Sequence, residues 1–238
     1  MQAVILAGGK GTRLRPYTVT MPKPLVPVGD LPILEIVIRQ LKHFKINEII
    51  LSIGHSAELI EAFFKDGRKW GVKIRYVRED RPLGTAGAIK NISCLDDNFI
   101  VMNGDVLTDI NYNQLFDFHL KYKGISTLSI IKREVLIDFG VIKINSDLEL
   151  ADYIEKPKHF NYVSMGIYVL NRACKDYISR GECIDIPDLI LKMKSKGKKI
   201  FCYEPRCYWL DIGRIEDFQT AQDQFVKNKR KFLYGQEY

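Results

Sequence analysis

The sequence of 238 residues contains no apolar run that approaches the roughly 20 residues needed to cross a bilayer as a helix. Its first residues, MQAVILAGG, lack the basic start and the cleavage site of a secretory signal peptide and instead predict a first strand. The five cysteines form no C-x-x-C pair, which argues against a disulfide framework or a zinc site. We therefore expect a cytoplasmic protein without membrane insertion.

The two commonest phosphate-binding fingerprints are also missing, although the segment LAGGKGTRLRP at 6–16 is rich in glycine. A G-x-G-x-x-G motif that began at Gly9 would need glycine at position 14, where Leu14 stands. A Walker A loop would need Lys-Ser or Lys-Thr after its second glycine, and Gly11 is followed by Thr12. The histidines show no metal-ligand spacing. A dinucleotide-dependent oxidoreductase is therefore not favoured.

The chain carries a net charge of +7, with an isoelectric point near 9.0. The basic residues are spread along the chain, so they do not predict binding to nucleic acid. The single dense cluster, which we expect to be a solvated tail, consists of Lys227, Lys229, Arg230 and Lys231. The excess charge is also suited to steering small anionic substrates.

Strand and helix patterns alternate along the first half of the chain. Apolar runs predict strands at 3–6, 48–53, 72–77 and 99–105. Helical spacing of apolar residues predicts helices at 34–41 and 59–64. This alternation predicts an α/β fold with a Rossmann-like, doubly wound and mostly parallel sheet. After about residue 124, closely spaced strand patterns predict an inserted antiparallel lobe, and helical patterns return near 185–195 and 215–225.

The glycine-rich segment has the chemistry of a phosphate cradle. Glycines allow backbone N–H groups to turn inward and allow a ligand to approach closely. Thr12 adds a hydroxyl donor, and Arg13 offers a planar fork of donors matched to phosphate oxygens. Taken alone, the segment also fits a tight surface turn with solvated arginines.

The motifs GGKGTRLRPYT and MPKPLVPVGDLPIL together resemble the opening signature of the sugar-1-phosphate nucleotidylyltransferases. The resemblance continues, in the right order, through PLGTAGAI, VMNGDVL, FGVIKI, YIEKP, SMGIYVL and YWLDIGRIEDF. Within that family the chain looks most like the mannose-1-phosphate and heptose-1-phosphate guanylyltransferases. The resemblance implies a GT-A-like nucleotidyltransferase fold in one domain, 1–238, with a nucleotide-binding half, 1–123, and a sugar-phosphate-binding half, 124–238.

The resemblance implies an enzyme that joins a nucleoside triphosphate, GTP being favoured, to a sugar 1-phosphate and releases pyrophosphate. Its catalytic residues would be Arg13, Lys23, Asp105 and Asp211, and the two aspartates would hold Mg²⁺. Taken alone, Lys23 also fits an exposed loop lysine, and each aspartate fits a cap of the following turn or helix. The residues that would bind the nucleotide are Leu6, Ala7, Gly8, Gly9, Gly11, Thr12, Arg13, Lys23, Pro82, Gly84, Thr85, Gly87 and Asp105.

The sugar phosphate would be bound by Gly140, Glu155, Lys156, Ser164 and Gly166. Glu155 would accept hydrogen bonds from sugar hydroxyls and Lys156 would pair with the phosphate, although the two also fit a cross-strand ion pair on a solvated ribbon. Many relatives carry asparagine and alanine where this chain has Ser164 and Met165, so the sugar pocket differs. This difference leaves mannose open to question and favours a heptose or a modified hexose more than the resemblance alone does, so a sugar of the mannose or heptose type is expected.

Two alternatives stay open. The chain could perform the same reaction with dTTP, UTP or CTP and glucose 1-phosphate, or it could be a non-catalytic regulatory relative that binds a nucleotide sugar. A non-catalytic relative would be marked by the loss of Lys23, Asp105, Lys156 or Asp211, and all four are present here. The sequence ends soon after the WLDIG motif, without room for the β-helix that larger relatives append. We therefore expect that any homodimer forms through the catalytic domain.

Overall fold

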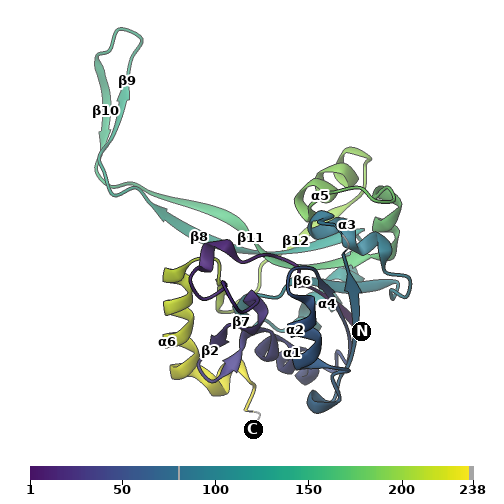
Figure 1. Ribbon diagram of the computed structural model, residues 1–238. Coiled ribbons are helices and arrows are strands. Elements are labelled where there is room, and N and C mark those ends of the chain that lie inside the picture. The colour runs from purple at the N-terminus through teal and green to yellow at the C-terminus, as the bar shows by residue number, and fades with distance from the viewer. Residues whose placement is uncertain (80, 236–238) are drawn as a thin grey trace.

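The central element is a seven-stranded sheet, seen in a computed structural model that describes residues 1–79 and 81–235 (Figure 1). In sheet order its strands are β12 (Ile200–Tyr203), β8 (Ser126–Leu136), β11 (Lys158–Asn171), β6 (Asn98–Asn103), β1 (Gln2–Leu6), β4 (Glu48–Ile53) and β5 (Lys73–Arg78). Strand β11 is antiparallel to both neighbours, and every other neighbouring pair is parallel. The predicted mostly parallel α/β sheet is confirmed.

Helices cover both faces of this sheet. The described helices are α1 (Ile33–His43), α2 (Ala57–Phe64), α3 (Gly84–Asn91), α4 (Tyr112–Tyr122), α5 (Ile186–Ser195) and α6 (Ile215–Phe232), with short 3-10 turns η1 (Thr12–Leu14), η2 (Lys23–Leu25), η3 (Arg68–Trp70) and η4 (Arg172–Tyr177). Helix α6 packs apart from the sheet, in a separate core with α1 and the strands near residues 26–31. Apolar residues of α1, α2 and α4 pack in one core, and those of α3 and α5 pack in another on the opposite face. The described residues include no helix long and apolar enough to span a membrane.

Three small two-stranded sheets complete the fold. They are β2 (Pro27–Val28) with β3 (Leu31–Pro32), β7 (Val106–Thr108) with β13 (Trp209–Asp211), and β9 (Val141–Ile144) with β10 (Leu150–Ile154). The pair β7–β13 is important for the site because it ties the chain after β6 to a segment one hundred residues later.

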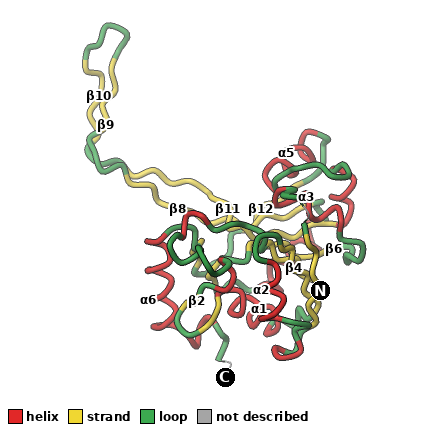
Figure 2. Tube along the Cα trace, viewed as in Figure 1, coloured by secondary structure: helices red, strands yellow, loops and turns green. Residues whose placement is uncertain are grey.

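The predicted antiparallel lobe takes the form of a long arm. Strands β8 and β11 belong to the central sheet at one end and leave the body as a two-stranded ribbon at the other (Figure 1). After a break in the strands, the hairpin β9–β10 extends the ribbon to its tip (Figure 2). We use the name arm for residues 132–162.

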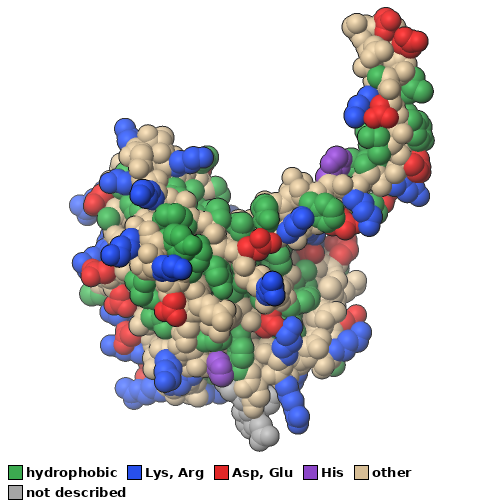
Figure 3. Space-filling view, turned by 180° about the vertical axis from the view of Figure 1, so that it is seen from behind, with side chains coloured by type: hydrophobic (Ala, Val, Ile, Leu, Met, Phe, Trp, Pro, Cys, Tyr) green, Lys and Arg blue, Asp and Glu red, His purple; other side chains and the backbone are tan. Residues whose placement is uncertain are grey.

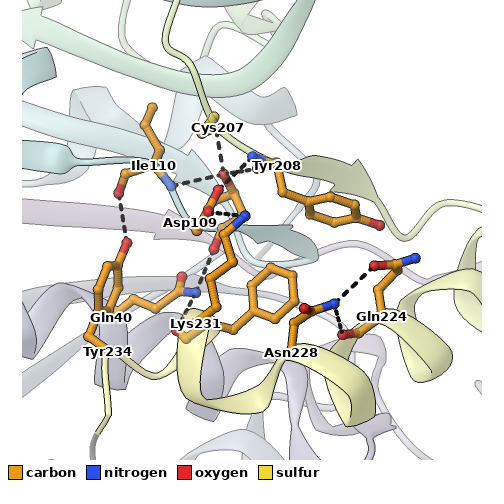
Figure 4. A network of polar contacts seen from close by, with 11 residues as sticks. Gln40, Asp109, Ile110, Cys207, Tyr208, Gln224, Asn228, Lys231 and Tyr234 are labelled. Carbon is orange, nitrogen blue, oxygen red and sulfur yellow. Dashed lines mark hydrogen bonds and ion pairs between the residues drawn. The ribbon is translucent and has the colours of Figure 1, made fainter.

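The basic cluster near the C-terminus is not a solvated tail, contrary to our expectation. It lies on the last turns of α6, where Lys229 pairs with Asp30 at 2.8 Å and Lys231 pairs with Asp109 at 2.7 Å. Asp109 also accepts a hydrogen bond from the backbone N–H of Tyr208 (Figure 4). Two of these cations therefore fasten α6 to the body of the protein.

A buried histidine links α4 to the sheet. His119 is 1% exposed, with Nδ1 2.9 Å from Thr127 Oγ1 and Nε2 3.0 Å from Asn98 Oδ1. Because that amide oxygen also accepts a bond from Asn171, it is an acceptor, so Nε2 donates and Nδ1 accepts from the threonine hydroxyl. Burial lowers the pKa of His119, so the folded protein holds a neutral imidazole.

This arrangement predicts a loss of stability in mild acid. The unfolded chain takes up a proton on His119 near pH 6.5, whereas the folded chain resists it. The contribution of neutral His119 to the free energy of unfolding should therefore be fully present above pH 6.5 and should decrease as the pH falls below 6.5. Urea titrations from pH 8 to pH 5 should show a shallower fall in a His119→Gln variant than in the parent, and equal slopes would contradict the assignment.

Candidate active site

A cleft of about 800 Å³ opens beyond the carboxyl ends of β1, β4 and β6. Ligands gather at this edge in open α/β sheets. Twelve of the thirteen residues that the resemblance assigns to nucleotide binding line the cleft, and the exception is Gly87. The cleft is also lined by residues that the sequence analysis did not single out, among them Ser52, Glu79, Asn103 and Asp185.

The glycine-rich segment forms one wall of the cleft. Gly11 has φ +63°, and a Cβ there would lie 3.0 Å from Thr18 Cγ2 and 3.1 Å from Lys23 Cβ. The hydroxyl of Thr18 donates to the Gly11 carbonyl at 2.8 Å, which holds the turn in place. Gly9 differs, because a Cβ there would meet no atom within 4 Å. The backbone at Gly9 is therefore open to the cleft, while Gly11 is required by the turn itself.

Two groups of opposite charge meet on the floor of the cleft. The 3-10 turn η2 begins at Lys23, and its ammonium pairs directly with Asp105 Oδ2. Both side chains are mostly enclosed, with exposed fractions of 13% and 22%. The second carboxylate oxygen of Asp105 is buried and has no hydrogen-bond partner among the described residues. A buried unsatisfied carboxylate oxygen is costly, on the order of 1–3 kcal/mol, and it is suited to a cation.

Asp211 is brought next to Asp105 by the pairing of β13 with β7, in which Asp211 lies opposite Val106. Burial raises the pKa of Asp211, the charge of Asp105 raises it further, and Lys23 and Arg13 lower it. Gly213 leaves room at this point, since a Cβ there would lie 3.0 Å from Asp211 Oδ2 and 3.8 Å from Arg13 Cζ. The four predicted catalytic side chains therefore gather in one place.

The donor set of this place fits Mg²⁺. The described residues hold no group of three or more His, Cys, Asp or Glu side chains that could bind a metal by themselves. Mg²⁺ is commonly held by one or two carboxylates together with phosphate oxygens and water. The unpartnered oxygen of Asp105 beside Asp211 supplies that number of carboxylates.

The opposite wall of the cleft is built on the start of α3. The side chain of Asp185 accepts bonds from both the backbone N–H and the hydroxyl of Thr85, at 2.7 and 3.0 Å. Gly84 has φ +75° and lies against the Ile184 carbonyl. Gly87 is buried against the Glu182 carbonyl, where a Cβ would lie only 2.6 Å away. Close packing of α3 on residues 182–185 therefore accounts for both glycines.

Glu79 joins three elements at the edge of the cleft. Its carboxylate accepts a bond from the Ser52 hydroxyl at 2.9 Å and another from the Leu83 N–H at 3.0 Å. A sequence signal for it existed, because Glu79 comes two residues after the end of the predicted strand at 72–77. Asp185 gave no such signal, because its place depends on the packing of α5 against α3.

The five residues predicted for the sugar phosphate divide into two groups. Ser164 and Gly166 lie at the β-bulge of β11, where a Cβ on Gly166 would lie 2.6 Å from the Asn103 amide of the cleft. Gly140, Glu155 and Lys156 lie on the arm, and none of the five residues lines the cleft. On the arm, Glu155 accepts a bond from the Tyr153 hydroxyl at 3.2 Å.

Comparison with known proteins agrees with this architecture. The family model described as nucleotidyl transferase matches residues 2–228. The chain is 33% identical to mannose-1-phosphate guanylyltransferase of Mycobacterium tuberculosis over 95% of its length. It is 31% identical to D-glycero-alpha-D-manno-heptose 1-phosphate guanylyltransferase of Aneurinibacillus thermoaerophilus over 94% of its length. It is 32% identical to UTP–glucose-1-phosphate uridylyltransferase of Synechocystis over 93% of its length.

The relatives differ in length. The chain spans 65% of the Mycobacterium protein and 62% of the Synechocystis protein, but 98% of the Aneurinibacillus protein. Among solved structures, HddC from Yersinia pseudotuberculosis is similar in fold, with a TM-score of 0.75 and 26% identity. That similarity covers 94% of this chain and 99% of HddC.

The loop geometry predicts different effects for substitutions at its two glycines. Gly9→Ala places a methyl group in open space, so the protein should fold normally. If phosphates lie against this backbone, affinity for a nucleoside triphosphate should fall about tenfold, or ~1.4 kcal/mol. Gly11→Val forces a β-branched residue to φ +63° and should cost about 1–3 kcal/mol of stability. Calorimetry and urea unfolding would measure both, and a Gly9→Ala variant with unchanged affinity would make the loop a simple turn.

Proposed function

The chain belongs to the nucleotidyl transferase family, and from this premise we propose that it is a sugar-1-phosphate nucleotidylyltransferase. The favoured substrates are GTP and a sugar 1-phosphate of the mannose or heptose type. The observation that carries the proposal is the gathering of Lys23, Asp105, Asp211 and Arg13 beside the glycine-rich wall of one cleft.

The reaction is a substitution at phosphorus. A phosphate oxygen of the sugar 1-phosphate forms a bond to the α-phosphorus of the nucleotide. The bond from that phosphorus to the bridging oxygen breaks, and pyrophosphate leaves with the electron pair. The attacking phosphate is already ionised at pH 7, so no strong general base is needed. Positioning two anions and matching their charge is the main task of the protein.

The side chains of the cleft are suited to that task. Backbone N–H groups of the glycine-rich wall and the guanidinium of Arg13 would hold the β- and γ-phosphates. Lys23, whose ammonium lies beside Asp105, would contact the α-phosphate. Asp105 and Asp211 would hold Mg²⁺, which when bound lowers the charge on the phosphates and orients them.

The relatives support guanine as the base more than any other. Two of the relatives described above are guanylyltransferases, and HddC from Yersinia pseudotuberculosis also has a solved structure complexed with GMP-PN. The chain matches the heptose 1-phosphate enzyme in length, since it spans 98% of that protein. UTP with glucose 1-phosphate is the second candidate substrate pair, because one relative is the uridylyltransferase of Synechocystis.

We also propose the cytoplasm as the working compartment and a homodimer as the working form. All five cysteines are free thiols, which is the state that a reducing compartment maintains. The reaction needs no nucleic-acid partner.

A substrate panel tests the proposal. The purified protein is incubated with Mg²⁺, each of GTP, UTP, dTTP, CTP and ATP, and a series of sugar 1-phosphates, and released pyrophosphate is measured. We expect pyrophosphate with GTP and a manno-configured hexose or heptose 1-phosphate. If no pair gives pyrophosphate while GTP still binds, the non-catalytic alternative replaces this proposal.

The metal assignment predicts a specific loss in Asp211→Asn. This change keeps the shape of the side chain and removes one of the two charges that would hold Mg²⁺. Turnover should fall about 100-fold or more, equivalent to ~2.7 kcal/mol of transition-state stabilisation, and the Mg²⁺ concentration for half-maximal rate should rise. Asp117→Asn, at an exposed position on α4, is the matched control and should behave as the parent. An Asp211→Asn variant with normal turnover at limiting Mg²⁺ would contradict the assignment.

A further inference from the structure

The arm exposes an unusual amount of apolar side chain. Twenty-one large hydrophobic residues are exposed in the described structure, and eleven of them lie within the arm. The most exposed are Phe139 at 77% and Leu148 at 78%. A two-stranded ribbon in water is at best marginally stable by itself, because it has no second layer to cover its faces. The arm therefore has the properties of a surface that packs against something else.

One face of the tip is formed by apolar pairs alone. In the register of β9 and β10, Ile142 lies opposite Tyr153 and Ile144 lies opposite Leu150. Ile142 and Ile144 are two apart and share a face, and the register shift between Leu150 and Asp152 brings Leu150 and Tyr153 to the same face. These four side chains form one continuous apolar face, which we call the open face. The other face is mixed, since it carries the ion pair of Lys143 with Asp152 at 3.1 Å beside the apolar pair of Val141 and Ile154.

The ribbon leads the tip away from the body. Strands β8 and β11 are paired from Lys158 opposite Leu136 to Leu170 opposite Ser126, with one bulge, so the direction of the ribbon is set by the central sheet. Figure 2 shows the tip at the far end of this ribbon. The cleft is lined entirely from outside the arm, as far as the described residues show. The arm thus carries Glu155 and Lys156 at a distance from the cleft of its own chain.

Charge favours a second copy of this chain as the partner. Residues 137–157, at the tip, hold five acidic residues and two lysines, a net charge of −3. Because the whole chain carries +7, the remainder carries +10. Acidic side chains are visible at the tip in Figure 3. Two tips repel each other, whereas the tip of one copy is attracted to the body of another. The cleft itself exposes Lys10 and Arg81 at its rim.

We propose that two copies pair reciprocally, and that the arm of each packs its open face on the partner and completes the partner's cleft. Glu155 and Lys156 of one chain then bind the sugar phosphate in the cleft of the other chain. This pairing is closed and two-fold, because each chain supplies one arm and one cleft. The proposal rests on the proposed function and adds that each site is shared between chains.

Complementation between two inactive variants tests the shared site. Lys23→Ala damages the cleft, and Lys156→Ala damages the arm, so each variant alone should lose turnover. Differently tagged variants are co-expressed, and mixed dimers are isolated through both tags. Each mixed dimer holds one site with both defects and one intact site, so turnover should return to about half of the parent value. Mixed dimers as inactive as the two variants would show that the arm serves the cleft of its own chain, and the proposal would fail.

Sedimentation equilibrium tests the interface without any need for activity. The parent should be a dimer, and Ile144→Asp, on the open face, should be a monomer. Lys143→Ala, on the same strand but the opposite face, is the matched control and should stay dimeric. A monomeric parent, or a dimeric Ile144→Asp, overturns the proposal even if the parent turns over no substrate pair. If the parent is a dimer and Ile144→Asp is a monomer, but the parent turns over no substrate pair, the proposed function is refuted and the proposed pairing is not.

Discussion

The close approach of two like charges is the constraint on which the cleft depends. Asp105 and Asp211 are placed side by side by the short β7–β13 pair, and burial together with their mutual repulsion raises the pKa of Asp211. Lys23 and Arg13 offset part of that cost from the other side. Folding alone gives no reason to keep such a cluster, because apolar side chains would fill the same space without repulsion. A carboxylate in a cleft whose pKa is raised by burial and by a neighbouring charge is typical of functional sites, where a cation and phosphates provide the remaining balance.

Much of this arrangement could be predicted from the sequence because its signals are local. The runs at 3–6 and 48–53 are short, apolar and rich in β-branched residues, and such runs form buried parallel strands in almost any context. Chain segments that follow these strands necessarily meet at one edge of the sheet. Asp105 therefore meets the glycine-rich segment because β6 lies beside β1 in the sheet.

The remaining features depend on contacts between distant segments. The segment at 84–91 is a helix despite two glycines, because those glycines pack against the backbone of residues 182–184. Strand β13 has three residues and exists only because β7 pairs with it. The cluster at 227–231 looks like a solvated tail by composition, but Asp30 and Asp109 hold it on α6. No local pattern encodes such partners.

For the arm, the sequence predicted the strands but not what covers them. Its strand pattern was readable, since the residues at 141–144 and 150–154 favour strands, but the sequence could not show whether a second layer covers them. An antiparallel lobe within a larger sheet would bury one face and leave the other to water. Here the face formed by Ile142, Ile144, Leu150 and Tyr153 is uncovered within one chain, and the tip has a charge opposite to that of the body. Both observations belong to the folded chain as a whole, and both are accounted for when a second copy supplies the missing layer.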